Sequence, residues 1–199
     1  PTFAVAGTAH GRIFTTLDGS DWTEFATLES LPVTDLAITD HSFYVAHTLG
    51  TVYRLDFAGT SVVVNDHESG FFGLLRTRVE VVPGPTANAD TVWIGVTSTD
   101  RSQHLYFSDD GGQTVQLRDS GLDGAGVFDI AIDPSTPDHV VVSTVGEGLF
   151  YTTDAGLQWT RATGELYGPA ILGIAEDPVD ADHLIALQTE GLVGTRGPY

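Results

Sequence analysis

A hairpin built around an Asp/Gly turn occurs repeatedly in this sequence, and it limits the fold more than any other feature. In its clearest copy an apolar run over residues 148–151 leads into Thr152, Asp154 and Gly156, and Trp159 follows the turn. Asp accepts hydrogen bonds from backbone amides of its own turn, and Gly adopts the positive φ that such turns need. Apolar residues before the turn and the Trp after it predict a pair of antiparallel strands.

Four further segments repeat this frame with different fidelity. Residues 108–115 keep the hydroxyl, the Asp and the Gly, whereas residues 15–22 carry Leu17 where the Asp is expected. A degenerate copy covers residues 54–60. The beginning of a fifth copy lies at residues 191–196, close to the end of the sequence. We assign a structural role in these turns to Ser108, Asp110, Gly112, Thr114, Thr152, Asp154, Gly156, Trp159, Thr15, Gly19 and Trp22.

These residues resemble the Asp box, the S/T-x-D-x-G-x-T-W motif of bacterial-neuraminidase-repeat (BNR) β-propellers. The resemblance implies an all-β fold, a β-propeller of about five four-stranded antiparallel blades with Asp-box turns and incomplete terminal blades. We expect Trp22, Trp93 and Trp159 to pack between the blades. The family includes sialidases and other glycosidases, but also sortilin-type receptors and photosystem-assembly propellers that only bind. The resemblance therefore says much about the fold and little about the function.

The spacing of the copies supports this architecture. Equivalent positions occur at Gly11, Gly50, His104, Gly148 and Gly191, and periods of about 40 to 50 residues with short strands are typical of propeller blades. We expect one domain over residues 1–199, with modules over 1–29, 30–69, 70–120, 121–164 and 165–199. Residue alternation predicts strands in groups of three, four, four, four and three, with 33–38 and 127–132 among the innermost. We favour a closed ring of five modules over a segment of a larger ring.

The charge of the chain excludes two classes of partner. All eight basic residues are Arg, and 27 Asp and Glu residues give a formal net charge of −19. Nucleic acids and anionic membranes repel such a chain, so we expect neither as a partner. The absence of Lys and the abundance of Asp resemble the proteins of salt-in haloarchaea. This composition favours the cytoplasm of such an organism, while an extracellular or virion-associated location stays open.

We assign no catalytic, metal or cofactor site from the sequence. The chain has no Cys, which excludes thiolate zinc sites and cysteine nucleophiles. Asp110 and Asp154 belong to turns of different modules, so their carboxylates cannot converge on one ion. The sialidase branch implies a cluster of three Arg, a Tyr nucleophile and an Arg-Ile-Pro run, whereas this chain has Phe14 at the Pro position. Arg76 and Arg78 stand at alternate positions of one expected strand.

One face of the expected propeller collects the loops that depart from the repeat. These are the loops between blades and the loops between second and third strands, and loop aromatics and Arg often anchor interfaces. The candidate partner-binding residues are His67, Phe71, Phe72, Arg101, His104, Glu147 and Tyr167. We expect a non-catalytic module that binds a protein, or a glycan, through this face. The alternative functions are a glycoside hydrolase of the sialidase-like propeller type and a structural component of a virion or surface layer. For Phe71 and Phe72 alone, the alternative role is to fill the channel between the blades.

Overall fold

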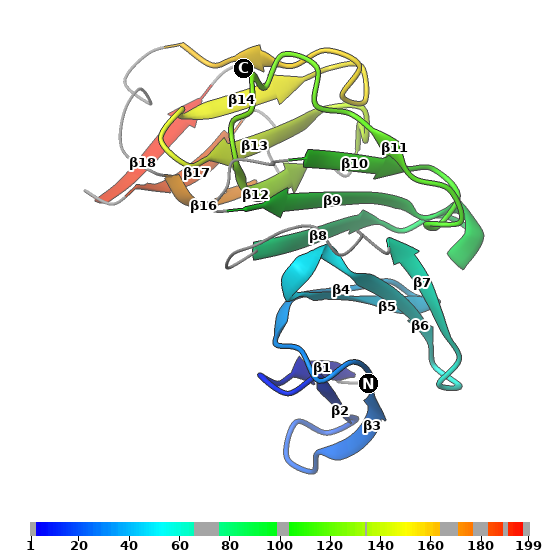
Figure 1. Cartoon of the computed structure of the whole chain (residues 1–199). Helices are drawn as coiled ribbons and strands as arrows, with labels where there is room; N and C mark the ends of the chain where they lie inside the picture. The colour runs from blue at the N-terminus through cyan, green and yellow to red at the C-terminus, as the bar shows by residue number, and fades with distance from the viewer. Residues whose placement is uncertain are drawn as a thin grey trace.

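The computed structural model describes residues 3–65, 76–98, 104–133, 135–163, 171–176, 183–188 and 191–196. Their strands form five antiparallel sheets that follow one another along the chain, with three, four, four, four and three strands (Figure 1). Within each sheet, consecutive strands are hydrogen-bonded neighbours. The predicted all-β fold, with about five antiparallel sheets and incomplete ends, is confirmed.

The strands have the following bounds. The first sheet contains β1 (Ala4–Gly7), β2 (Arg12–Thr16) and β3 (Thr23–Thr27). The second contains β4 (Val33–Ile38), β5 (Ser42–His47), β6 (Val52–Asp56) and β7 (Ser61–Asn65). The third contains β8 (Arg76–Val82), β9 (Thr91–Thr97), β10 (His104–Ser108) and β11 (Gln116–Leu117). The fourth contains β12 (Val127–Ile132), β13 (Val140–Thr144), β14 (Leu149–Thr152) and β15 (Thr160–Arg161), and the fifth contains β16 (Ile171–Glu176), β17 (His183–Gln188) and β18 (Gly191–Arg196). Two short 3-10 helices, η1 (Thr48–Gly50) and η2 (Ala87–Ala89), lie in loops.

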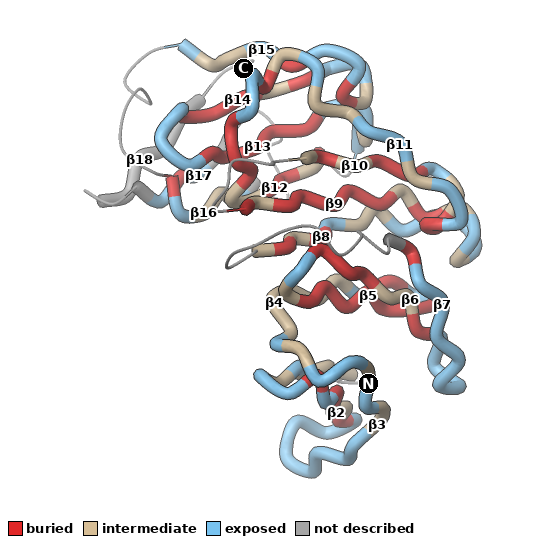
Figure 2. Tube along the Cα trace, viewed as in Figure 1, coloured by how far each residue is buried: buried red, intermediate tan, exposed pale blue. Residues whose placement is uncertain are grey.

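The hydrophobic core lies between successive sheets. One cluster, which includes Ile13 and Phe43, joins the first sheet to the second, and another, which includes Val141 and Ile171, joins the fourth to the fifth. The middle sheets are covered on both faces, so every residue of β5 is buried and most of β9 is buried as well (Figure 2). Strands covered on both faces contain near-continuous apolar runs, as β9 does with Val92, Trp93 and Ile94.

The three Trp residues differ in environment. Trp93 and Trp159 are buried between the third and fourth sheets, and their rings meet edge to face with centroids 5.9 Å apart. Trp22 is 43% exposed, so the expectation that all three pack between sheets is wrong for this residue. The reason is its place beside β3, because the first sheet has a neighbouring sheet on one face only (Figure 1).

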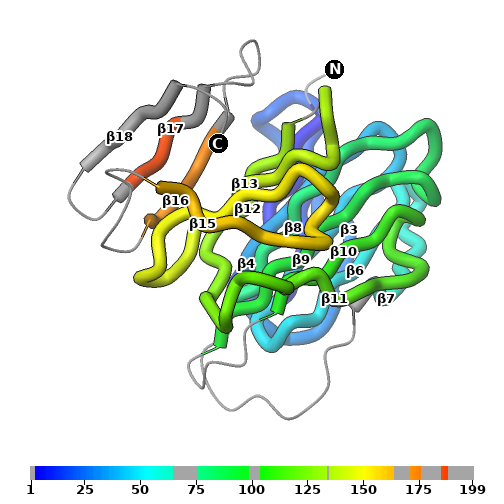
Figure 3. Tube along the Cα trace, turned by 90° about the horizontal axis from the view of Figure 1, so that it is seen from above, coloured from blue at the N-terminus to red at the C-terminus, as the bar shows by residue number. Residues whose placement is uncertain are grey.

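The five sheets form an open arc. The innermost strand β4 packs beside both β1 and β8, and β12 packs beside both β8 and β16. The first and last sheets lie at opposite ends of the molecule, and the view from above shows β16 on one side beside β12 and β13 (Figures 1 and 3). The closed ring of five modules that the sequence favoured is therefore not formed by the described residues.

Candidate functional site

The Asp turns lie at one end of the sheets and satisfy their own polar groups. The Ser108 hydroxyl donates to Asp110 Oδ1 at 2.8 Å and accepts the Gly112 N–H at 2.8 Å, while the Thr114 N–H donates to Asp110 Oδ1 at 2.9 Å. In the next sheet Thr152, Asp154 and Gly156 repeat the first two bonds at 2.7 and 3.0 Å. Because these hydrogen bonds stay within each turn, they support the proposed structural role of the Asp-box residues.

The fourth-sheet turn also binds its neighbour. The Gln158 N–H donates to Asp154 Oδ1 at 3.1 Å, and the indole N–H of Trp159 donates to the Arg118 carbonyl of the preceding sheet at 2.7 Å. The hydrogen bond from Thr152 is the main cause that lowers the pKa of Asp154, with the Gln158 N–H next. The turn therefore joins two sheets and holds a charged carboxylate.

The first hairpin uses a different residue from the one the sequence indicated. The Thr16 hydroxyl, not that of Thr15, donates to Asp18 Oδ1 at 3.0 Å and accepts the Gly19 N–H at 2.9 Å. The turn is one residue shorter than the others, so Asp18 takes the Asp position and Leu17 is 73% exposed. The Asp21 and Ser20 N–H groups, at 2.9 Å each, lower the pKa of Asp18 to about 2.

The opposite end of the sheets carries a cleft between the third and fourth sheets. Its volume is about 990 Å³, and it opens on the face with the loops between sheets and between second and third strands. The cleft is lined by the ends of β8 and β9, by the loop over residues 121–126 and by the β13–β14 loop, which contains Val145 and Glu147. This is the face on which the sequence placed the partner-binding residues.

The predicted partner-binding residues divide into three groups. Glu147 lines the cleft. His104 begins β10, and its Nδ1 lies 3.3 Å from Asp119 Oδ2, outside the cleft lining. The remaining predictions lie outside the described residues: His67, Phe71, Phe72, Arg101 and Tyr167.

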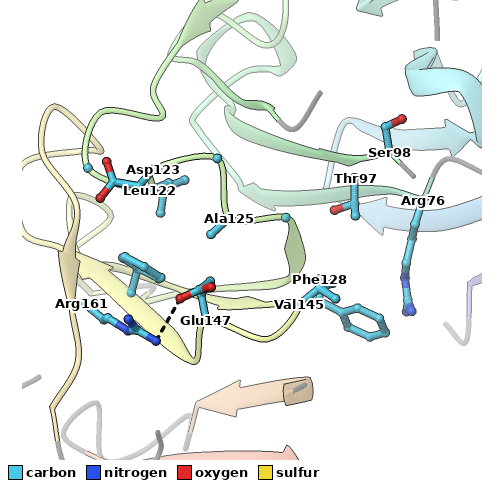
Figure 4. A pocket seen from close by; sticks show the side chains of 14 residues that line it. Arg76, Thr97, Ser98, Leu122, Asp123, Ala125, Phe128, Val145, Glu147 and Arg161 are labelled. Atoms are coloured by element: carbon cyan, nitrogen blue, oxygen red, sulfur yellow. Dashed lines mark ion pairs between the residues drawn. The ribbon is translucent and has the colours of Figure 1, made fainter. Parts of the chain in front are cut away.

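Two Arg residues lie toward opposite ends of the cleft (Figure 4). At one end Arg161 forms an ion pair with Glu147 at 3.1 Å and lies over the Phe150 ring at 5.9 Å. At the other end Arg76 lies over the Phe128 ring at 3.9 Å. Both contacts have the geometry of a cation–π interaction. Burial is the main cause that lowers the pKa of Arg76, with nearby Arg78 the second cause.

Arg78, two residues further along β8, forms two ion pairs and a hydrogen bond. Its guanidinium lies 3.3 Å from Asp35 Oδ1 and 3.5 Å from Asp129 Oδ1, and its Nε donates to the Phe128 carbonyl at 3.1 Å. Burial raises the pKa of Asp35, and the charge of Arg78 opposes that rise. Arg78 therefore links the innermost strands of three sheets, whereas Arg76 faces the cleft.

The sequence did not single out Arg76 and Phe128 as site residues. A signal was present, since Arg76 and Arg78 alternate on an innermost strand of a chain with only eight basic residues. Their contact with Phe128, about 50 positions further along, depends on how two sheets pack and has no local signature. Leu122, Ala125 and Val145 contribute the apolar part of the cleft lining, and Thr97, Ser98 and Asp123 add polar groups.

Neither a metal centre nor a membrane span is found in the part of the chain that the structure describes. No group of three His, Asp or Glu side chains there is arranged to hold a metal ion. The same residues include no helix that could cross a bilayer.

Comparison with known proteins relates this chain to others by structure alone. No protein-family model and no curated protein matches it. A GH74 enzyme of Niastella koreensis superposes with a TM-score of 0.78 at 13% identity, over 98% of this chain and 35% of that one. YCF48 bound to a D1 peptide superposes with a TM-score of 0.68 at 17% identity, over 99% of this chain and 62% of that one. The β-propeller domain of Cps50 (Swd1) from Myceliophteria thermophila superposes with a TM-score of 0.70 at 13% identity, over 98% of this chain and 62% of that one. The chain is a β-propeller.

The propeller spans about a third of the length of the GH74 enzyme and under two thirds of the other two chains. At these identities the likeness shows the fold and not the activity. The cleft between the third and fourth blades is the candidate functional site in the described part of the propeller.

Proposed function

We propose that this β-propeller is a non-catalytic binding module that recognises a protein partner through its loop-rich face, with the cleft between blades three and four as the binding site. The observation that carries the proposal is the cleft itself. It combines apolar walls at Leu122 and Val145 with the charged groups of Arg76 and of the Arg161–Glu147 pair. A concave, largely apolar site with a few fixed polar groups is the usual form of a recognition site.

Two further observations support a protein partner. Val145 is 49% exposed at the cleft wall although it is aliphatic, so a partner side chain that covers it removes apolar surface from water. Among the solved structures that the propeller resembles, YCF48 is bound to a D1 peptide. The other residues that the sequence predicted for partner binding, His67, Phe71, Phe72, Arg101 and Tyr167, lie outside the described residues and stay predictions.

Selection of peptides on the folded propeller tests this proposal. A random peptide library is panned on the immobilised protein, and the enriched peptides are measured against two matched variants. Val145→Trp fills the cleft, and Leu157→Trp places the same side chain on an exposed aliphatic position of the opposite face, where Leu157 is 62% exposed. We expect Val145→Trp to weaken binding about tenfold or more and Leu157→Trp to leave it unchanged. Peptides that bind both variants as tightly as the parent, or a library without enrichment, would contradict the proposal.

Glycoside hydrolysis is the second candidate, because GH74 enzymes are among the structural neighbours and two acids, Asp123 and Glu147, line the cleft. Hydrolysis by two carboxyls requires both to flank the scissile bond within about 5 to 10 Å. Glu147 is engaged by Arg161 at 3.1 Å, and Figure 4 shows Asp123 pointing away from it. Release of reducing sugar from xyloglucan by the parent protein, abolished in Glu147→Gln, would establish this alternative in place of the binding role.

A further inference from the structure

The guanidinium of Arg76 differs from the other stacked guanidinium groups in the described part of the propeller. Four Arg side chains lie over Phe rings: Arg12 over Phe14, Arg76 over Phe128, Arg118 over Phe107 and Arg161 over Phe150. Arg12 is also hydrogen-bonded to Glu24, and Arg118 to the Gln116 side-chain oxygen at 3.1 Å, while Arg161 forms its ion pair with Glu147 at 3.1 Å. Within the described residues, Arg76 has the ring contact and no carboxylate or amide acceptor.

The two carboxylates whose charges act on Arg76, Asp35 and Asp129, are already engaged by other groups. Asp35 and Asp129 both pair with Arg78. Their remaining oxygens accept backbone N–H groups, Asp35 Oδ2 from Val79 at 3.1 Å and Asp129 Oδ2 from Ile174 at 3.0 Å. The donors of Arg76 therefore remain available to a group that enters the cleft.

The other end of the same cleft shows what such a guanidinium binds. Arg161 lies over Phe150 and pairs with the carboxylate of Glu147. The Arg76 guanidinium lies 3.9 Å from the centre of the Phe128 ring, closer than the 5.9 Å between the Arg161 guanidinium and the Phe150 ring. Within the described residues, no carboxylate pairs with Arg76. A planar guanidinium held on a ring presents its N–H donors in the geometry of a bidentate carboxylate contact. The Arg76 guanidinium is therefore suited to bind a carboxylate from outside the chain.

The surroundings favour a peptide as its source. Polyanions such as nucleic acid are repelled by a net charge of −19, whereas a single carboxylate meets a local cation. A sugar would need an open aromatic face for stacking, but Arg76 and Arg161 each cover a face of the Phe rings in the cleft. Aliphatic side chains next to the carboxylate can pack on Val145, which is 49% exposed at the cleft wall.

We propose that the cleft recognises a peptide carboxylate, from a chain end or from an acidic side chain, which Arg76 binds while neighbouring aliphatic residues pack on the Val145 wall. This inference rests on the proposed function and specifies the chemistry of its partner. Charge-assisted hydrogen bonds to a guanidinium predict a preference of about tenfold or more over a neutral peptide.

Three synthetic libraries of acetylated hexapeptides made from Ala, Leu, Val, Ser, Thr and Tyr test the inference by fluorescence polarisation. The first library ends in a free carboxylate, the second is amidated and contains one internal Glu, and the third is amidated and neutral. We expect one of the two charged libraries to bind the parent about tenfold tighter than the neutral one, and the stronger of the two identifies the source of the carboxylate. Arg76→Gln should remove most of that preference, Arg76→Lys should keep part of it, and the control Arg118→Gln should keep all of it.

The outcomes separate this inference from the proposed function. If neutral peptides bind as tightly as charged ones, and Val145→Trp abolishes this binding, the carboxylate specificity is overturned and the binding role stays intact. Binding that keeps its charge preference in Arg76→Gln would also overturn the inference. Failure of all three libraries to bind would overturn the inference and the proposed function together. Equal thermal midpoints of Arg76→Gln and the parent establish that any lost binding does not reflect unfolding.

Discussion

Asp129 Oδ2 accepts the backbone N–H of Ile174 at 3.0 Å and thereby joins the innermost strand of the fourth blade to that of the fifth. Asp35 makes the same bond to Val79 at 3.1 Å, between the second and third blades. In both strands a shift of register precedes the Asp, between Val33 and Asp35 and between Val127 and Asp129. A β-bulge re-aims the next side chain, so here it turns each Asp toward the following blade.

Removal of one such carboxylate should destabilise the propeller. In Asp129→Ala the Ile174 N–H and the Arg78 guanidinium both lose an acceptor, and we expect a loss of about 1 to 3 kcal/mol in the free energy of unfolding. Chemical denaturation measures this loss. The control is Asp21→Ala on the exposed first hairpin, which should change stability by less than about 0.5 kcal/mol. Equal stability of both variants would contradict a role for Asp129 in joining the blades.

The Asp turns should contribute stability and not binding. In Asp154→Ala the Gln158 N–H and the Thr152 hydroxyl lose their acceptor, and we expect a cost of about 1 to 2 kcal/mol. The selected peptides should bind this variant with the affinity of the parent, because the turn lies on the face opposite the cleft. Full stability with lost peptide binding would show that the proposed structural role is wrong.

A buried histidine should make stability depend on pH near neutrality. His47 is fully buried, and in the described residues neither ring nitrogen has a hydrogen-bond partner. Burial lowers its pKa in the folded state, against a smaller opposite effect of Glu29. Below about pH 6.5 the His47 ring therefore binds a proton in the unfolded chain but not in the folded chain. As the pH decreases, the free energy of unfolding falls by up to about 1.4 kcal/mol per pH unit.

Denaturant titrations between pH 8 and pH 5.5 measure this effect. His47→Leu should abolish the slope, whereas His10→Gln, at an exposed position, should keep it. If the leucine variant does not fold, the NMR titration of the His47 ring in the parent gives the same information. A ring that gains its proton at or above pH 6.5 would contradict the prediction.

The acidic composition should make the propeller depend on salt. With a net charge of −19, the carboxylates of the chain repel one another in dilute buffer. At molar salt the screening length falls to about 3 Å, which weakens this repulsion. We expect the thermal midpoint to rise steeply between dilute buffer and molar potassium chloride, and to rise much less with sucrose, which does not screen charge. A midpoint that is unchanged by potassium chloride would remove the basis for a halophilic origin.

The sequence predicted the features that depend on neighbouring residues. The expected innermost strands at 33–38 and 127–132 match β4 and β12, because alternation and β-branched residues are local signals. The grouping of strands into five sheets follows from the repeated turns. The first hairpin was assigned one residue out of register, with Thr15 in place of Thr16, because its turn is shorter than the Asp box.

Features that depend on packing between blades could not be predicted in this way. Closure of the ring is set by small rotations between sheets, which no single motif encodes. The contact of Arg76 with Phe128 joins two blades, and so does the bond of Asp129 to Ile174. The position of Glu147 in the loop between β13 and β14 follows from strand order, whereas its ion pair with Arg161 depends on how β14 pairs with β15.

An NMR map of the ¹⁵N-labelled propeller with its tightest selected peptide tests the central claim most directly, because it reads both faces in one experiment. We predict that the largest amide shift changes occur at residues 121–126 and 145–147, around the cleft, and that they are lost in Val145→Trp. Changes centred instead on residues 110–114 and 154–158 would place the partner on the Asp-turn face and contradict the assignment of the cleft as the binding site.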